Sequence, residues 1–245
     1  MRTYLSYSVL LLPLLCLPHI ASAADETADT PLEITANTAL EWDQNAKTYV
    51  ARGNALAKQN DMSLQADLLT AYYDDTKANT ITKLVAEGHV TITSGTDKAT
   101  ADKAVYDIQK GQGDLTGGRP QIIRANNDML EADSITIWTQ KTDGTAKGAS
   151  LNRAEAIGTA IITNGIQRVS GDKVVFSSVT NTAEIFGHVK IEQDKNWLSG
   201  DYADMNLTTH ISHVKTSGST QQVKGVFFTK SAASPKPAKD TTKHD

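Results

Sequence analysis

Aspartate, a residue type able to act in acid and base catalysis, recurs along this chain in a box that begins with a small residue. Five copies are Ala66-Asp67, Ala101-Asp102, Ala132-Asp133, Gly171-Asp172 and Gly200-Asp201, and Ala36-Asn37 resembles a further copy. Recurring carboxylates would suit the two acids of a glycoside hydrolase. Aspartate also accepts hydrogen bonds from turn amides at the start of strands, and we favour this structural interpretation for the boxes.

The histidines are not predicted to bind a metal or to act in catalysis. His89 and His188 occupy equivalent places in two related boxes, EGHV and FGHV, so we expect both side chains to face solvent. His210 and His213 are three residues apart, and in a strand this spacing sends two side chains to opposite faces, which predicts no metal site. The sequence also contains no Gly-x-Ser-x-Gly motif and no phosphate loop. We therefore expect no catalytic residue, no cofactor and no enzyme activity.

A second recurring box has glycine at its centre and suggests a repeat array. Its copies are ARGNALAK around Gly53, AEGHVTIT around Gly88, AIGTAIIT around Gly158, IFGHVKIE around Gly187 and the degenerate TGGRPQII around Gly118. In each regular copy the glycine falls within the apolar face of a strand, where it indicates a bulge or bend. Leu84, Ala86, Val90 and Ile92 share that face with Gly88, and Glu87 and His89 lie on the wet face.

The elements that would hold these boxes are strands. Between the boxes the chain alternates apolar and polar residues, is rich in Thr, Val, Ile and Gly, and has no sustained helical period. The aspartate boxes follow one another at intervals of 29 to 39 residues, with connectors rich in turn-forming residues. We expect an all-β fold of two-strand units joined as antiparallel hairpins, with roughly a dozen strands or more.

The ends of the 245-residue chain indicate export. Residues 1–23 contain Arg2, an apolar run and then Ala-Ser-Ala, the pattern of a secretory signal peptide cleaved before Ala24. A retained membrane anchor is the weaker alternative, because the run is short and contains two prolines. Cleavage would remove Cys16, the single cysteine, so no disulfide is expected. We predict a flexible leader at 24–31, one domain at 32–230 and a disordered tail at 231–245.

Net charge bears on the class of partner. The chain has 24 Lys and Arg against 28 Asp and Glu, and the signal peptide contributes one arginine, so the mature protein would carry a formal charge of −5. An acidic balance argues against nucleic acid as a partner.

Together the signal peptide, the Ala-Asp boxes and the E-G-x-V-x-I boxes resemble the OstA-like (organic solvent tolerance) family, and especially its soluble periplasmic bridge of lipopolysaccharide export. The resemblance runs from about Leu32 to about Lys230. It implies a β-jellyroll or β-taco of two facing antiparallel sheets, in which acyl chains of lipopolysaccharide lie between the sheets. It also implies a periplasmic location, head-to-tail assembly of copies through edge strands, and contacts with an inner-membrane export complex and an outer-membrane insertion complex.

The parity of the boxes and this resemblance together select candidates for an apolar groove that binds acyl chains. They are Val90, Ile92, Ala104, Tyr106, Ile135, Ile137, Val174, Phe176, Val189, Ile191 and Met205. Four basic residues near the rim, Arg119, Arg124, Arg153 and Lys173, suit lipid phosphates or are ordinary solvated charges. A solid sandwich core is the alternative use of the apolar faces.

Two other functions remain open at this stage. One is an exported β-solenoid with carbohydrate-active chemistry, which would need the carboxylates clustered on one surface. The other is a structural or adhesive module that binds no lipid. The degenerate glycine box TGGRPQIIR departs from the family pattern and leaves the number of strands uncertain.

Overall fold

The structure is a computed structural model that describes residues 31–77, 80–140, 150–218 and 222–229. The predicted signal peptide at 1–23, nearly all of the leader at 24–31 and the tail at 231–245 lie outside these ranges. Strands make up most of the described chain, and its one helical segment there is the short 3-10 turn η1 (Asp75–Lys77). None of the described helical structure is long and apolar enough to cross a membrane.

Sixteen strands follow one another along the described chain. The first eight are β1 (Glu33–Thr35), β2 (Ala39–Asp43), β3 (Thr48–Gln59), β4 (Met62–Asp74), β5 (Thr80–Ser94), β6 (Asp97–Asp107), β7 (Gln112–Thr116) and β8 (Gln121–Ile123). The others are β9 (Met129–Glu131), β10 (Ser134–Gln140), β11 (Ser150–Asn164), β12 (Gln167–Ser177), β13 (Thr182–Gln193), β14 (Asn196–Asn206), β15 (Ile211–Lys215) and β16 (Lys224–Val226).

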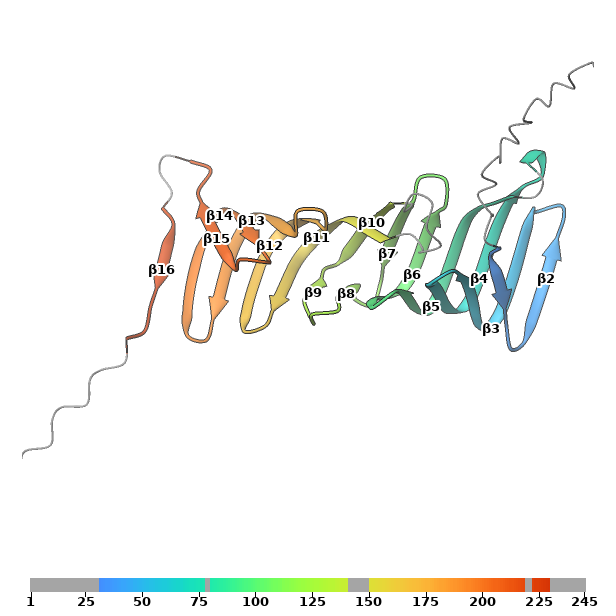
Figure 1. Ribbon diagram of the computed structural model, residues 1–245, viewed down its shortest axis with the longest axis horizontal. Helices are drawn as coiled ribbons and strands as arrows, with labels where there is room; N and C mark the ends of the chain where they lie inside the picture. Colours follow the sequence, from blue (N-terminus) through green and yellow to red (C-terminus); the bar gives the residue numbers. More distant parts are fainter. Residues whose placement is uncertain (1–30, 78–79, 141–149, 219–221, 230–245) are drawn as a thin grey trace, which may run out of the picture.

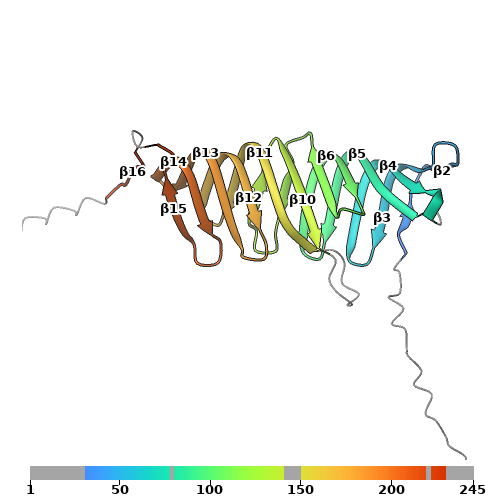
Figure 2. The ribbon, with the colours of Figure 1, turned by 90° about the horizontal axis from the view of Figure 1, so that it is seen from above.

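Every pairing between these strands is antiparallel, and most pairs are neighbours in sequence. The strands stack in chain order along the long axis of an elongated body, with β2 near one end and β16 at the other (Figures 1 and 2). The all-β, jellyroll-like architecture predicted from the sequence is therefore confirmed. An antiparallel sheet does not fit the β-solenoid alternative, because a β-solenoid winds its repeats as parallel coils.

The sheet forms two facing layers because its long strands pass from one layer to the other. In β5, residues 80–87 pair within the first layer and residues 90–94 within the second, and the pairing shifts between Glu87 and Val90. Similar shifts interrupt β3, β4, β11, β12 and β13. We call the line of these shifts the crease, and the opposite side, where the turns of the two layers face each other, the open margin.

The glycine box explains how a strand bends at the crease. Gly88 has φ +77° and His89 has φ +46°, so two successive residues adopt the left-handed conformation. A β-carbon on Gly88 would lie only 2.3 Å from Oδ2 of Asp67 on the neighbouring strand. Glycine is therefore required here both by the backbone angle and by the close approach of the aspartate.

Four of the five aspartate boxes pack against the next glycine box. Asp133 lies against Gly158 and Asp172 against Gly187 in the same way as Asp67 against Gly88. The expectation that aspartate starts a strand is wrong for four of the five boxes, because these residues lie inside continuous strands; Asp133 lies between β9 and β10. The physical reason is that the aspartate side chain fills the outside of the bend, so the strand continues through it.

The degenerate third box keeps the packing but breaks the strand. Gly117 and Gly118 both have positive φ and lie against Asp102, as a regular glycine box would. The chain then leaves the first layer at β7 and enters the second layer as the separate short strand β8, which pairs with β6 and β9. The second layer is consequently built here from two three-residue strands and the loop between them.

Candidate functional site

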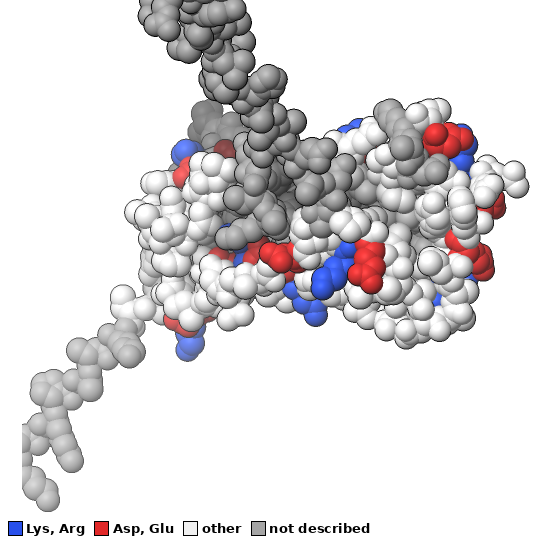
Figure 3. Space-filling model, turned by 45° about the vertical axis from the view of Figure 1, so that its right-hand side comes forward, with Lys and Arg blue, Asp and Glu red and all other residues white. Residues whose placement is uncertain are grey.

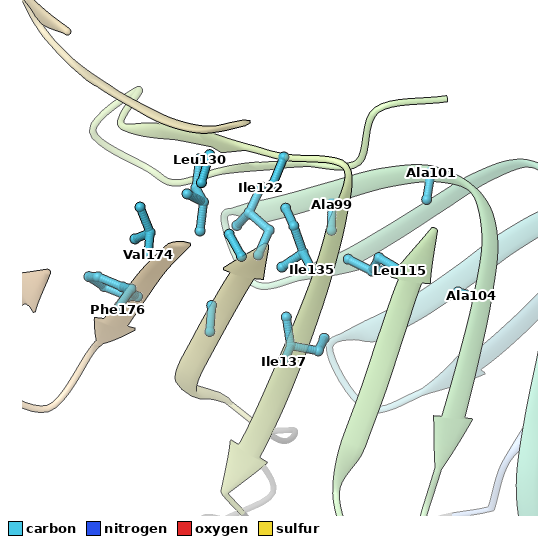
Figure 4. Close-up of a cluster of buried hydrophobic side chains, with 14 of the residues drawn as sticks. Ala99, Ala101, Ala104, Leu115, Ile122, Leu130, Ile135, Ile137, Val174 and Phe176 are labelled. Carbon is cyan, nitrogen blue, oxygen red and sulfur yellow. The ribbon is translucent and has the colours of Figure 1, made fainter. Parts of the chain in front are cut away.

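The interior between the two layers is the most extensive apolar feature of the described chain. Nine of the predicted groove residues are buried there, and Ile92 and Tyr106 are half-buried and pack against the same cluster. Figure 4 shows Ile122 and Leu130 of the second layer facing Ile135, Val174 and Phe176 of the first. The nine are Val90, Ala104, Ile135, Ile137, Val174, Phe176, Val189, Ile191 and Met205. Their placement fits the predicted interior, and their contact with lipid stays a prediction.

Small and large residues lie beside each other on neighbouring strands of this interior. Ala154 pairs with Ile137 on one side and with Phe176 on the other. Ala183 likewise pairs with Phe176 and with Met205. The small side chains leave room for the large ones, so the two layers pack closely.

The space left inside is small. One apolar cavity of about 30 Å³ lies between Ile122, Leu130 and Ile162 of the second layer and Ala154 and Phe176 of the first. A second, of about 40 Å³, lies between the layers near the N-terminal end, beside residues such as Leu64, Ala104 and Ile137. The volume of each cavity is little larger than that of one water molecule in the liquid. The two layers are thus closed against each other, and an acyl chain would enter only if they separate.

The outer surface of the crease carries the aspartates and histidines of the boxes. Nδ1 of His89 lies 2.7 Å from Oδ2 of Asp67, and Nδ1 of His188 lies 2.8 Å from Oδ2 of Asp172. Both histidine side chains are about 90% exposed, which confirms that they face solvent. Hydrogen bonding to the aspartate, followed by its charge, raises the pKa of each histidine above its ordinary value of 6.5.

These carboxylates do not form a catalytic pair. Asp67 and Asp102 lie on strands separated by β5, which places them roughly 10 Å apart at two strand spacings. The described residues include no group of three or more His, Cys, Asp or Glu side chains that could hold a metal ion. Acidic and basic side chains instead lie beside each other on the face seen in Figure 3. The arrangement offers no acid and base facing one substrate position.

The open margin is spanned near its middle by the loop between β8 and β9. Nη1 of Arg124 in this loop donates a hydrogen bond of 2.8 Å to Oδ1 of Asn181, which lies in the turn between β12 and β13. The guanidinium also lies over the ring of Phe176, with Cζ 5.0 Å from the ring centroid. The loop therefore connects the second layer to the first across the mouth of the interior.

The four basic residues predicted near the rim differ in their partners. Arg119 contacts Asp133 and Glu131, and Arg153 and Lys173 both contact Glu155. Arg124 forms no ion pair with any carboxylate of the described residues, and its Nε is buried without a hydrogen-bond partner. Three of the four are thus neutralised surface charges, and Arg124 is the exception.

Sequence reasoning missed two features of this margin. It did not predict the contact between Arg124 and Asn181, which are 57 residues apart. It also did not single out Asp128, a carboxylate buried to 5% exposure whose Oδ2 accepts a hydrogen bond from Nδ2 of Asn126. The one signal available was the irregular TGGRPQIIR box, whose last residue, Arg124, begins this loop.

Comparison with known proteins bears on the family. Residues 33–143 match the family model described as LptA/(LptD N-terminal domain) LPS transport protein. Among solved structures, the crystal structure of LptH from Pseudomonas aeruginosa, the LptA homologous periplasmic component of a lipopolysaccharide transport device, matches at 11% identity. The alignment covers 82% of this chain and 96% of LptH with a TM-score of 0.24, too low to support an argument. No curated protein matches. The match over residues 33–143 confirms the resemblance of the aspartate and glycine boxes to the OstA-like family.

Proposed function

We propose that this protein is a non-enzymatic, periplasmic lipopolysaccharide carrier that holds acyl chains between its two layers. The observation that carries the proposal is the continuous apolar interior, which receives buried residues from every unit of the array. The similarity of residues 33–143 to this family supports lipopolysaccharide as the ligand, since the family is described as transport proteins of that lipid. Each methylene removed from water would contribute about 0.8 kcal/mol to binding.

Opening of the layers is part of this proposal, because the cavities inside are too small for an acyl chain. The layers are joined covalently at the crease and meet at the open margin through side-chain contacts, among them the hydrogen bond of Arg124 to Asn181. The lower-energy motion is therefore a separation at the open margin with the crease as hinge, because breaking side-chain contacts costs less than breaking the strand pairing.

The ends of the array suggest how copies assemble. Among the described strands, β1 and β2 form the edge at the N-terminal end, and β15 and β16 form the edge at the C-terminal end (Figure 1). Unpaired edges are templates for pairing with another chain. Head-to-tail pairing of these edges would extend the interior from copy to copy, and would bridge an inner-membrane export complex and an outer-membrane insertion complex.

A photocrosslinking experiment tests the interior. A photoreactive amino acid would replace Ile137 or Val189, which point inward, or their outward-facing neighbours Thr136 and Lys190. We expect lipopolysaccharide adducts from the inward pair and few from the outward pair. Equal labelling of both pairs would refute the interior as the binding site, and absence of any adduct would favour the structural or adhesive module instead.

A further inference from the structure

Arg124 has the features of an anion-binding side chain. Its Nη1 is bonded to a neutral amide oxygen, that of Asn181, at 2.8 Å, and its Nε is buried and unpartnered. The side chain is half-buried, and no carboxylate of the described chain forms an ion pair with it. An arginine in this condition gains most from a ligand oxygen that bears negative charge, because charge-assisted bonds are the strongest hydrogen bonds available to it.

The surroundings of Arg124 add an apolar requirement to this anionic one. The residue lines the cavity between the layers together with Ile122, Leu130, Phe176 and Leu207, whose side chains offer only carbon to a ligand. The cavity lies at the open margin, where the proposed separation of the layers would widen it. A ligand that satisfies both sides would have an anionic head at Arg124 and an acyl chain extending between the layers.

We propose that Arg124 is the headgroup-binding residue of this interior, and that it receives a phosphate or carboxylate attached to an acyl chain. This inference rests on the proposed function, since the acyl chain must lie between the layers. On binding, the guanidinium exchanges its bond to Asn181 for bonds to the anion, and the loop at 124–128 detaches from the first layer. Recognition of the head and opening of the mouth are then one event, because the same side chain makes both contacts.

Asp128 lowers the affinity of this subsite for an anion. Its buried carboxylate lines the same cavity and is held by Nδ2 of Asn126 at 2.6 Å rather than by the guanidinium. A fixed negative charge near an anion subsite weakens anion binding by repulsion. The Asp128→Asn substitution should therefore strengthen binding of an anionic amphiphile, the opposite effect to loss of Arg124.

The test compares amphiphiles that share a ten-carbon chain and differ in the head. Decyl phosphate, decyl glucoside and decyltrimethylammonium would be titrated calorimetrically into the protein below their micelle concentrations, with inorganic phosphate as a fourth ligand. We expect decyl phosphate to bind roughly tenfold more tightly than the uncharged glucoside, as expected for a charge-assisted bond. The Arg124→Gln substitution should remove this preference and leave glucoside binding unchanged.

Arg153→Gln is the matched control. Arg153 also lies over an aromatic ring, that of Trp138 at 4.7 Å, but its charge is neutralised by Glu155. Its substitution should leave the phosphate preference intact, and circular dichroism would verify that both variants are folded. If decyl phosphate and decyl glucoside bind equally, or if Arg153→Gln has the same effect as Arg124→Gln, the headgroup role is wrong while the carrier function stands.

The other outcomes separate further possibilities. Inorganic phosphate that competes as well as decyl phosphate would show a site for free anions and overturn the amphiphile inference. Failure of all three decyl amphiphiles to bind would overturn the carrier function itself, and the headgroup role with it.

Discussion

The crease and the open margin of this fold are built on different principles. At the crease one local arrangement recurs, in which an aspartate packs against a glycine on the next strand and the chain passes through residues with positive φ. At the open margin the structure describes contacts that do not recur, such as the bond of Arg124 to Asn181. The comparison indicates that the repeat specifies the bend of the strands, and that the irregular positions opposite the crease are where individual function can arise.

The largest effect on stability is expected from a substitution at the crease. Replacement of Gly88 by alanine places a β-carbon 2.3 Å from Asp67 Oδ2 and imposes φ +77° on a residue with a side chain. We expect the free energy of unfolding to fall by about 3 kcal/mol or more, measured from urea denaturation. Gly95→Ala is the control, since Gly95 also has positive φ but nothing lies within 4 Å of its added β-carbon.

The Gly95 variant should lose only about 1 kcal/mol, the backbone contribution alone. The difference between the two variants then measures the close packing of aspartate and glycine. Equal losses would mean that this packing contributes nothing and that the crease depends on backbone angles only.

A smaller effect is expected at the margin. Asn181 has φ +51°, so Asn181→Gly removes the acceptor of the Arg124 bond without straining the turn. We expect a loss of about 1 kcal/mol and faster hydrogen exchange at the Asn127 amide, which donates to the Arg124 carbonyl at 2.9 Å. Exchange at the Asp133 amide, which donates to Gly158 at the crease, should not change.

Asn181 also donates to Thr208 Oγ1, so Thr208→Val is needed as a control that leaves the Arg124 bond in place. Accelerated exchange at Asn127 in both variants would mean that the turn, and not the bond across the mouth, holds the loop at 124–128. The hydrogen bond of Arg124 to Asn181 would then not restrain the hinge motion proposed for lipid entry.

The same contrast explains what the sequence could predict. Alternation around Gly88 assigned Val90 to the interior and His89 to solvent, because a strand has a two-residue period and the bulge preserves it on that strand. The location of Asp67 inside a continuous strand was not predicted, because small residues before an aspartate also suit a strand start. The partner of Arg124 lies 57 residues away, and no local pattern encodes such a contact.

The smallest expected effect concerns the exposed histidines of the crease. Asp67 raises the pKa of His89 mainly through the hydrogen bond, so this pair stabilises the fold at pH values below 6.5 and the contribution disappears as pH rises through the folded pKa. Proton NMR titration should give midpoints above 6.5 for both His89 and His188. In Asp67→Asn the midpoint of His89 should fall while that of His188, paired with Asp172, stays in place.

Because both rings are almost fully exposed, solvent screens these pairs, and the stability of the crease should depend on its glycines far more than on pH. A crease that unfolded on deprotonation of the histidines would reverse that order and make the hinge responsive to pH.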